Sequence, residues 1–407
     1  MTGNGSLNGW ARKTLRDLAT INYGKSPKEI LSSDGLYPVV GTGGNERYGD
    51  GFLYDGESII LGRKGTIDRV HFATGRFWAI DTAYYLSNFN DALPLWLFYF
   101  LNTIDLRQLN EATGVPSLSR DLLYQIEVAK PPKPEQTKIA EILSTADRAI
   151  EQMEGLIAKH QRIKTGLMQD LLTRGIDEHG NLRSEETHKF KNSLLGRIPV
   201  EWNVERLGTI AQVSSGLTLG KTHSGPNTIE LPYLRVANVQ DGYLNLDDVK
   251  TIRVPVFYAE KYELMVGDVL MNEGGDFDKL GRGTVWRGEI PHCLHQNHVF
   301  KVRPKDKVLA SGFLAYVSSS PYGKAFFVLA SKQSTNLASI NSTQLKTFPV
   351  SLPSYCEQEK IEEVLSQNET RINLFHERLR KLRSLKTALM QDLLPGNVRV
   401  LSLLEDK

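Results

Sequence analysis

The sequence is poor in the features that mark secreted, membrane-spanning or strongly charged proteins. It has only two cysteines, Cys293 and Cys356, in 407 residues, too few for a disulfide framework and in keeping with a reducing cytoplasm. The longest apolar run, at 94–101, is far shorter than the roughly 20 residues that cross a bilayer, and the opening residues hold no apolar core of a secretory signal. The net charge of +2 neither requires nor excludes a nucleic-acid partner. We therefore expect a soluble, cytoplasmic protein.

Motifs for nucleotide or group-transfer chemistry are missing as well. GLTLGKT at 216–222 is similar to a phosphate-binding loop, but only three residues separate its outer glycines and no helical pattern follows. The glycine-rich stretch at 41–51 does not have the dinucleotide-binding spacing. The prolines at 131–132 lie between lysines and do not match the Asn/Asp-Pro-Pro-aromatic motif of adenine methyltransferases. No Ser-His-Asp arrangement or helicase motif stands out, so we expect a non-catalytic chain with no cofactor of its own.

What the chain does contain is an internal repeat. KTGLMQDLL at 164–172 returns as KTALMQDLL at 386–394, a displacement of 222 in the numbering with one mismatch in nine. The same displacement relates Glu135-Gln136 to Glu357-Gln358, Lys138-Ile139 to Lys360-Ile361, Pro131 to Pro353, Val128 to Val350, Leu118 to Ile340 and Thr113 to Thr335. Near the start of each half the displacement is 192, which relates Trp10, Leu15, Ala19 and Gly24 to Trp202, Leu207, Ala211 and Gly216. The ends of each half are therefore repeated, while the middles diverge and the second middle is longer by the difference between the two displacements.

Each half ends in a long amphipathic segment. Its apolar positions advance alternately by four and three residues over more than four heptads, which is the pattern of a coiled-coil seam. The expected seam residues are Ile139, Leu143, Ile150, Met153, Ile157, Leu167, Leu171, Ile361, Leu365, Ile372, Phe375, Leu379, Leu382, Leu389 and Leu393. About 36 helical residues span roughly 54 Å. Two such helices most simply pack on each other, although a helix pair that binds an outside partner is an alternative.

Polar residues interrupt this seam at four positions, His160, Lys164, Asn368 and Lys386. Polar seam residues help to fix the register of a coiled coil. Each helix is expected to start after a proline-containing loop and to end at a glycine, Gly175 in the first half and Gly396 in the second.

The remaining segments predict two mixed α/β domains, an α+β organisation. Apolar runs at 58–62 and 268–271 follow turn residues and indicate buried strands, and helical patterns lie near 94–110 and 311–327. The expected layout is a first domain at 1–133, a helix at 134–174, a linker at 175–200, a second domain at 201–354, a second helix at 355–395 and a tail at 396–407.

One segment of the second domain, PHCLHQNH at 291–298, holds three histidines and a cysteine. A zinc site needs ligands at fixed spacing and a second cluster elsewhere, whereas the equivalent stretch of the first half, FWAIDTAYY at 77–85, has neither residue type. A strand with incidental histidines is favoured, and no metal is expected.

Several residues are candidates for contact with DNA. They are Arg47 and Tyr48 in the glycine-rich stretch, Arg63 and Lys64 between two glycines, Lys221, Arg235 and Asn238, and Lys279 and Arg282 in the longer insert of the second domain. Backbone at glycines can approach phosphate closely, and Arg and Asn bind guanine and adenine edges through two hydrogen bonds. Each residue is also explained as a solvated surface group, and the stretch at 41–51 equally as a surface hairpin.

The whole plan resembles the specificity (S) subunit of type I restriction-modification systems. The resemblance rests on the helix starts Glu135-Gln136 and Glu357-Gln358 behind prolines, on the twin Leu-Met-Gln-Asp-Leu-Leu helix ends, and on GRIPVEW at 196–202 with its counterpart around Trp10. It covers nearly all of the chain. The first repeat departs from the pattern because only nine residues precede Trp10.

This resemblance implies two target recognition domains that each read one half of a split DNA site. The two helices would pack antiparallel as a coiled coil that spaces the domains and relates them by a pseudo-twofold axis. Half-sites on the same side of DNA lie about 34 Å apart per helical turn, within reach of such a rod. The implied partners are two methyltransferase subunits, which use S-adenosylmethionine, and restriction subunits, with ATP and S-adenosylmethionine expected on partners only. The competing interpretation is a coiled-coil scaffold with two protein-binding modules and no DNA role.

Overall fold

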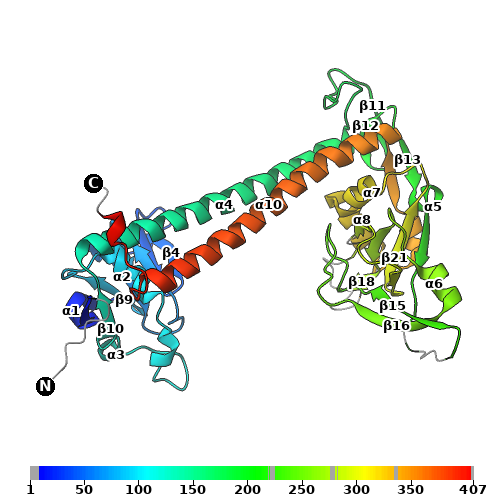
Figure 1. Cartoon of the computed structure of the whole chain (residues 1–407). Helices are drawn as coiled ribbons and strands as arrows, with labels where there is room; N and C mark the ends of the chain where they lie inside the picture. Colours follow the sequence, from blue (N-terminus) through cyan, green and yellow to red (C-terminus); the bar gives the residue numbers. More distant parts are fainter. Residues whose placement is uncertain are drawn as a thin grey trace. The chain divides into compact units, whose positions relative to one another are not determined.

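The computed structural model describes residues 9–404 apart from 219, 221–224, 276–279, 282 and 334–337 (Figure 1). The chain folds into two compact units, one made of Met1–Leu156 with Phe375–Lys407 and the other of Ile157–Leu374. Each unit therefore combines one globular domain with part of both long helices. The predicted α+β organisation with two domains and two long helices is confirmed.

The globular part of the first unit consists of small sheets covered by short helices. Its strands are β1 (Ala11–Thr14), β2 (Thr20–Tyr23), β3 (Tyr37–Gly41), β4 (Gly44–Gly49), β5 (Tyr54–Asp55), β6 (Ser58–Gly62), β7 (Val70–Ala73), β8 (Arg76–Ala79), β9 (Ala83–Ser87) and β10 (Glu127–Lys130). Its helices are α1 (Leu15–Leu18), α2 (Pro94–Leu101), the 3-10 helix η1 (Leu106–Leu109) and α3 (Arg120–Tyr124). Two four-stranded sheets have the orders β2-β9-β6-β7 and β4-β3-β8-β5, and β1 pairs with β10.

The globular part of the second unit has more elements. Its strands are β13 (Asn203–Arg206), β14 (Ala211–Ser215), β15 (Thr228–Leu234), β16 (Lys250–Pro255), β17 (Val269–Asn272), β18 (Gly274–Gly275), β19 (Gly283–Val285), β20 (Leu294–His295), β21 (Val299–Pro304), β22 (Lys332–Gln333), β23 (Ala338–Ser339) and β24 (Pro349–Leu352). Its helices are α5 (Leu207–Ile210), α6 (Val256–Tyr262), α7 (Ser311–Ser319), α8 (Pro321–Ala330) and α9 (Ser342–Lys346). The sheets are β14-β21-β17-β19, β16-β15-β20 and β18-β23-β22, with β13 paired to β24.

The two domains share one strand plan. The order β14-β21-β17-β19 repeats β2-β9-β6-β7, and β15 pairs antiparallel with β16 and parallel with β20, as β3 does with β4 and β8. The displacement between equivalent elements is 217 at the starts of α2 and α7, and 222 at the starts of α3 and α9. It thus grows in steps, so the additional residues of the second domain are spread over several connections and do not form one insert.

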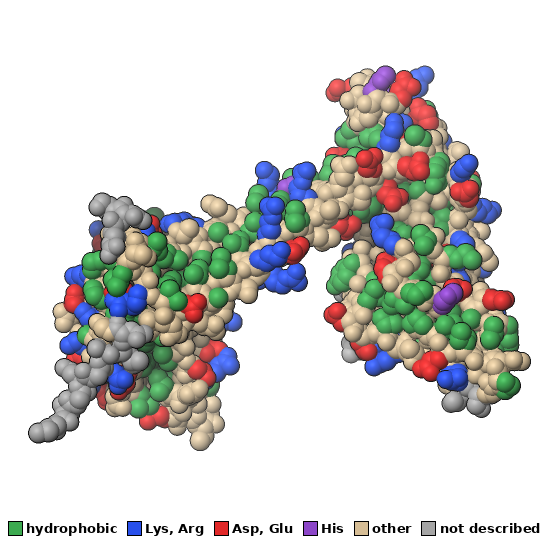
Figure 2. All heavy atoms as spheres, viewed as in Figure 1, with side chains coloured by type: hydrophobic (Ala, Val, Ile, Leu, Met, Phe, Trp, Pro, Cys, Tyr) green, Lys and Arg blue, Asp and Glu red, His purple; other side chains and the backbone are tan. Residues whose placement is uncertain are grey.

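The two long helices are α4 (Lys133–Thr173) and α10 (Tyr355–Leu393). In the first unit Asp147 pairs with Lys386 and Glu154 with Arg383. The residue number thus falls on one helix as it rises on the other, and the predicted antiparallel packing is confirmed. Lys and Arg side chains gather along the middle of the helix pair, among hydrophobic and uncharged ones (Figure 2).

Seam residues near the helix ends belong to the globular cores. Ile139 and Leu143 at the start of α4 are fully buried in the core of the first unit. Ile361 and Leu365 at the start of α10 hold the same place in the second. Mid-helix seam residues differ between the two helices: Ile150 and Met153 on α4 are only half-buried, whereas Ile372 and Leu379 on α10 are buried. Full burial is worth about 1.5–3 kcal/mol for such a side chain, so packing in the domain cores anchors the helices.

The segment at 175–200, expected to be a linker, is partly structured. It contains the hairpin β11 (Phe190–Ser193) and β12 (Gly196–Pro199), and Ile176, Arg183 and Ile198 are buried. The tail at 396–404 is also packed, with Val400 buried in the core of the first unit and η3 (Leu401–Leu403) at its end. Across the described residues, no helix has the length and apolar character needed to cross a membrane.

Candidate functional site: helix junctions and nucleic-acid interface

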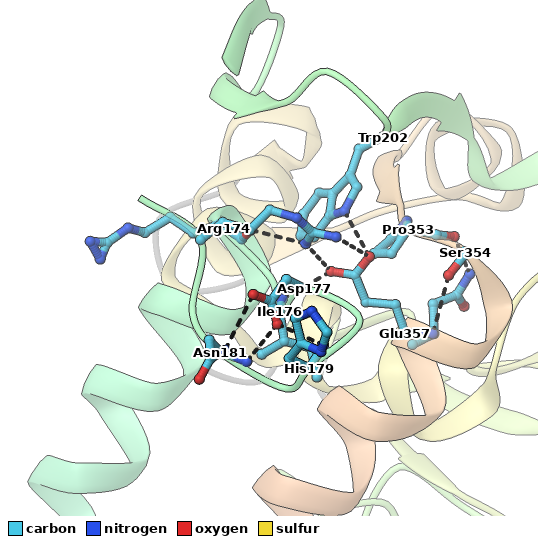
Figure 3. Close-up of polar contacts among 11 residues, drawn as sticks. Arg174, Ile176, Asp177, His179, Asn181, Trp202, Pro353, Ser354 and Glu357 are labelled. Carbon is cyan, nitrogen blue, oxygen red and sulfur yellow. Dashed lines mark hydrogen bonds and ion pairs between the residues drawn. The ribbon is translucent and has the colours of Figure 1, made fainter. Parts of the chain in front are cut away.

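The start of α10 carries a buried glutamate that binds the segment following α4 (Figure 3). Glu357 is 8% exposed, and its carboxylate accepts from both terminal nitrogens of Arg183, with Nη2 at 3.1 Å. It also accepts the backbone N–H of Ile176 at 3.0 Å and Trp202 Nε1 at 3.3 Å. A buried charge is tolerated when it is paired and its remaining lone pairs are satisfied. This junction therefore fastens the helix start, the end of α4 and the entry to the second domain together.

The start of α4 carries the same arrangement in the first unit. Glu135 is 1% exposed and accepts from Arg399 Nε at 2.8 Å and Nη2 at 2.5 Å. The Arg399 guanidinium lies 5.5 Å from the ring centre of Trp10, the residue that corresponds to Trp202. The tail after α10 thus supplies the arginine that pairs with the buried glutamate of the first unit, as the segment after α4 does in the second.

The glutamine that follows each glutamate holds the next element of the domain. Gln136 accepts the Leu93 N–H at 2.7 Å, and Gln358 accepts the Ala310 N–H at 2.8 Å. Leu93 and Ala310 are the N-cap residues of α2 and α7, whose first amides lack partners within the helix. Both glutamines also donate to the carbonyl of the proline five residues before them. The Glu-Gln pair in the repeat is therefore a device that docks a domain helix on a long helix.

A second tie joins both long helices to each domain. In the first unit Asp147 on α4 accepts from Lys386 on α10 at 2.5 Å and from the hydroxyl of Tyr99 on α2 at 2.7 Å. In the second unit Glu369 on α10 accepts from Lys164 on α4 at 2.7 Å and from Tyr316 on α7 at 2.9 Å. The repeat displacement of 222 relates Asp147 to Glu369 and Lys164 to Lys386. We call each set a Tyr–carboxylate–Lys tie.

The ties explain why lysines interrupt the seam, and they shift the titration of their tyrosines. Burial, helped by the neighbouring carboxylate, raises the pKa of Tyr99 and of Tyr316 well above the usual range. The other polar seam residues also meet, with His160 Nδ1 3.3 Å from Asn368 Oδ1. Each polar position of the seam therefore has a polar partner: His160 and Asn368 contact each other, and Lys164 and Lys386 pair with carboxylates.

Four candidates for DNA contact lie on the first domain. Arg47 and Tyr48, on β4, line a pocket of about 370 Å³ with Leu31, Ser32 and Ser33, and half of the Tyr48 side chain is exposed. Arg63 follows β6, donates to the Asp81 carbonyl at 2.9 Å and lies over the Tyr23 ring. Lys64 is exposed beside it and bridges to Ser117. The alternative interpretation of this stretch, a surface hairpin, agrees with the antiparallel pairing of β3 and β4.

Two of the DNA-contact candidates in the second domain, Arg235 and Asn238, form contacts within the protein. Asn238 is only 3% exposed; its oxygen accepts the Arg235 N–H, and its amide donates to the carbonyls of Asn245 and Asp248. Arg235 is ion-paired with Asp248 at 2.9 Å. Asn238 thus holds a loop closed and has no edge left for a base, so we leave it out of the proposed interface. Lys221, Lys279 and Arg282 lie outside the described residues.

The histidine-rich segment is spread over separate contacts. His292 pairs with Glu263 and His298 with Glu273, while buried His295 bonds the Val299 carbonyl. Burial raises the pKa of the neighbouring Cys293 to about 12. Within the part of the chain that is described, no cluster of three or more His, Cys, Asp or Glu is arranged to hold a metal ion.

Sequence reasoning missed the partners of the repeated residues. Arg183 and Arg399 lie in the expected linker and tail, and Tyr99 and Tyr316 lie in the domains. The signals in the sequence were the repetition of Glu135 as Glu357, at displacement 222, and of Tyr99 as Tyr316, at displacement 217. A charged residue kept at the start of a buried helix needs a partner.

Comparisons with known proteins agree with this geometry. A family model described as type I restriction modification DNA specificity domain matches residues 8–160 and 199–384. The chain is 28% identical over 367 residues to the MjaVIII specificity subunit of Methanocaldococcus jannaschii, covering 86% of this chain and 79% of the relative. It is 23% identical over 283 residues to the EcoDI specificity subunit of Escherichia coli, covering 65% and 62%.

Solved structures show the same fold. The S subunit of a type I restriction-modification system from M. genitalium has a TM-score of 0.65 at 18% identity, covering 97% of this chain and 100% of that one. A chain from a study of complex assembly and conformational transition of the type I system has a TM-score of 0.52 at 16% identity, with coverage of 97% and 100%.

Proposed function

Because this chain belongs to the type I restriction-modification DNA specificity family, we propose that it is a sequence-recognition subunit whose two domains each read one half of a bipartite DNA site. Subunits of this family are non-catalytic. The proposal rests on one observation. The buried Glu–Arg contacts at the helix starts and the Tyr–carboxylate–Lys ties occur in both halves, whereas the sequences of the two domain middles differ. A duplicated enzyme would keep reactive residues in both copies, whereas here the supporting contacts are what both copies share.

The helix pair acts in this proposal as the spacer between the half-sites. α4 has 41 residues, which corresponds to roughly 60 Å at about 1.5 Å per residue. Each helix starts in the core of one domain and ends in the core of the other. The proposed spacing therefore depends on two helices that are each anchored in a domain core at both ends.

Catalysis and cofactors belong to partner subunits in this proposal. The helix pair docks two methyltransferase subunits, which carry S-adenosylmethionine, and restriction subunits with ATP complete the assembly. The Lys and Arg side chains that gather along the middle of the helix pair (Figure 2) offer basic surface for such docking. In this proposal the chain supplies sequence recognition and takes no part in the reaction.

The proposal is tested by selecting duplexes from a random DNA library with the full chain and its methyltransferase subunits. We expect a split motif with two specified halves, and binding that weakens steeply as salt rises, because phosphate contacts release counterions. A scaffold with two protein-binding modules would enrich no motif, even with the methyltransferase present.

A further inference from the structure

A compact basic and aromatic cluster lies at one corner of the first domain. Tyr23 ends β2, and the guanidinium carbons of Arg63 and Arg120 lie 5.2 and 5.0 Å from the centre of its ring. The Tyr84 ring packs 5.2 Å from that of Tyr23. The Tyr23 side chain is 46% exposed, so the cluster is supported from behind and open to solvent. Cation–π contact of this kind fixes the plane of a guanidinium.

The two arginines of this cluster retain free donors. Arg63 gives one bond to the Asp81 carbonyl, and within the described part of the chain neither Arg63 nor Arg120 forms an ion pair with a carboxylate. Other arginines of the same domain are neutralised, since Arg76 pairs with Asp55 and Arg107 with Asp68. Two guanidinium groups held against one aromatic ring, without a paired carboxylate, form a preorganised surface for hydrogen-bond acceptors.

The corresponding corner of the second domain can be located from the strand registers. Tyr23 is opposite Tyr84 and Tyr84 opposite Leu61; Ser215 is opposite Phe300 and Phe300 opposite Met271. Two residues beyond Leu61 is Arg63, and two beyond Met271 is Glu273. Arg120 begins α3, as Ser342 begins α9.

The chemistry of the two corners is opposite although their backbone plan is the same. Tyr23, Arg63 and Arg120 are replaced by Ser215, Glu273 and Ser342, and Glu273 is bonded to His298. In contrast, the Glu-Gln helix starts and the Tyr–carboxylate–Lys ties are retained in both halves. A contact with DNA phosphate serves any sequence and would suit both domains equally. A contact with a base edge must differ where the half-sites differ.

We propose that Tyr23, Arg63 and Arg120 form a guanine-reading site of the first domain, an inference that rests on the proposed function. Arginine binds O6 and N7 of guanine through two parallel hydrogen bonds. A guanidinium whose plane is fixed on an aromatic ring loses little freedom on making that contact. Tyr23 orients the arginines, and Arg63 and Arg120 touch the base edge.

The test compares sequence preference across variants of the full chain, assembled with its methyltransferase subunits and presented with the random duplex library. Arg63→Lys keeps the charge but not the planar fork, and Arg120→Gln removes the second guanidinium. Arg12→Gln is the control, because Arg12 is an exposed cation of the same domain outside the cluster. We expect the two cluster variants to lose about 10- to 100-fold of the preference for guanine at one or two positions of a single half-site. The other half-site, and the control variant, should be unchanged.

Three outcomes separate the alternatives. Equal weakening on all sequences, with a shallower salt dependence and the motif intact, would identify a phosphate contact and overturn base reading. An unchanged motif at unchanged affinity would remove the cluster from the interface altogether. If the unaltered chain selects no motif, the proposed function itself fails. Glu273→Gln supplies the reciprocal check, since it should leave the guanine preference untouched.

Discussion

At the helix junction of the second unit, the residue at position 175 is packed so closely that it has no space for a side chain. Gly175, just after α4, has a positive φ of +63°, and a Cβ there would come within 2.2 Å of Glu357 Oε1 and 2.3 Å of the Trp202 ring. The left-handed conformation itself costs a side-chain-bearing residue about 1–2 kcal/mol. Glycine at this position therefore lets the chain pass against the buried ion pair.

The substitution Gly175→Ala should lower the free energy of unfolding by about 2–4 kcal/mol, since backbone strain and crowding add. Gly155→Ala is the matched control: it lies inside α4, a Cβ there meets nothing within 4 Å, and removing a helical glycine should raise stability by about 0.5–1 kcal/mol. Urea denaturation measures both. Equal changes in the free energy of unfolding for the two variants would show that Gly175 is not closely packed at the junction.

At the scale of elements, the Tyr–carboxylate–Lys ties connect each domain to both long helices. Because burial raises the folded-state pKa of Tyr99 and Tyr316, each contributes stability that is fully present below the unfolded pKa of about 10. That contribution is lost as the pH rises from there through the folded pKa, because the unfolded chain gives up its proton first.

Tyr316→Phe should consequently cost about 1.5–3 kcal/mol at neutral pH, the value of a hydrogen bond to a charged group, and less above pH 10. Chemical denaturation at a series of pH values checks this. Tyr243→Phe, at a tyrosine that is 61% exposed, serves as the control and should leave the pH dependence as it was. A difference between Tyr316→Phe and the unaltered chain that stayed constant with pH would argue against the tie.

The helix pair itself can be shortened without touching the ties. Residues 150–156 on α4 lie opposite 377–383 on α10, by the register that pairs Asp147 with Lys386. Removing both heptads shortens the rod by about 10 Å, roughly three base-pair steps of about 3.4 Å. We expect the gap in the selected motif to shrink accordingly while both half-sites persist. Removing 150–156 alone breaks the pairing and should abolish the motif, and an unchanged gap in the paired deletion would contradict the spacer.

For the molecule as a whole, the tail after α10 is part of the first unit. Arg399→Gln leaves Glu135 buried without its partner, which should cost about 3–5 kcal/mol. The double variant with Glu135→Gln removes both charges and should recover much of that loss. Limited proteolysis of the first domain reports the change, and a double variant as labile as the single one would show that the ion pair is not the cause.

The sequence predicted elements better than contacts between distant segments. The helices and their seam follow from a local period, so Ile139 or Leu389 could be assigned from neighbours alone. Arg183 and Arg399 could not, because their glutamates lie 174 and 264 residues away and both arginines fall where the repeat is not visible. Asn238 was predicted to contact DNA because asparagine can bind adenine. The same side-chain amide can also hold a loop closed, and only its burial in the structure distinguishes the two roles.

Each long helix is shared by two cores, with α4 buried at Leu143 in one and at Leu171 in the other. The two long helices are therefore elements that both domains use, whereas a loop such as that of Arg63 belongs to one domain only. Mutational tolerance should be distributed accordingly, narrow along the helices and wide at the outer loops. New recognition surfaces can then arise on either domain while the frame that carries them stays unaltered.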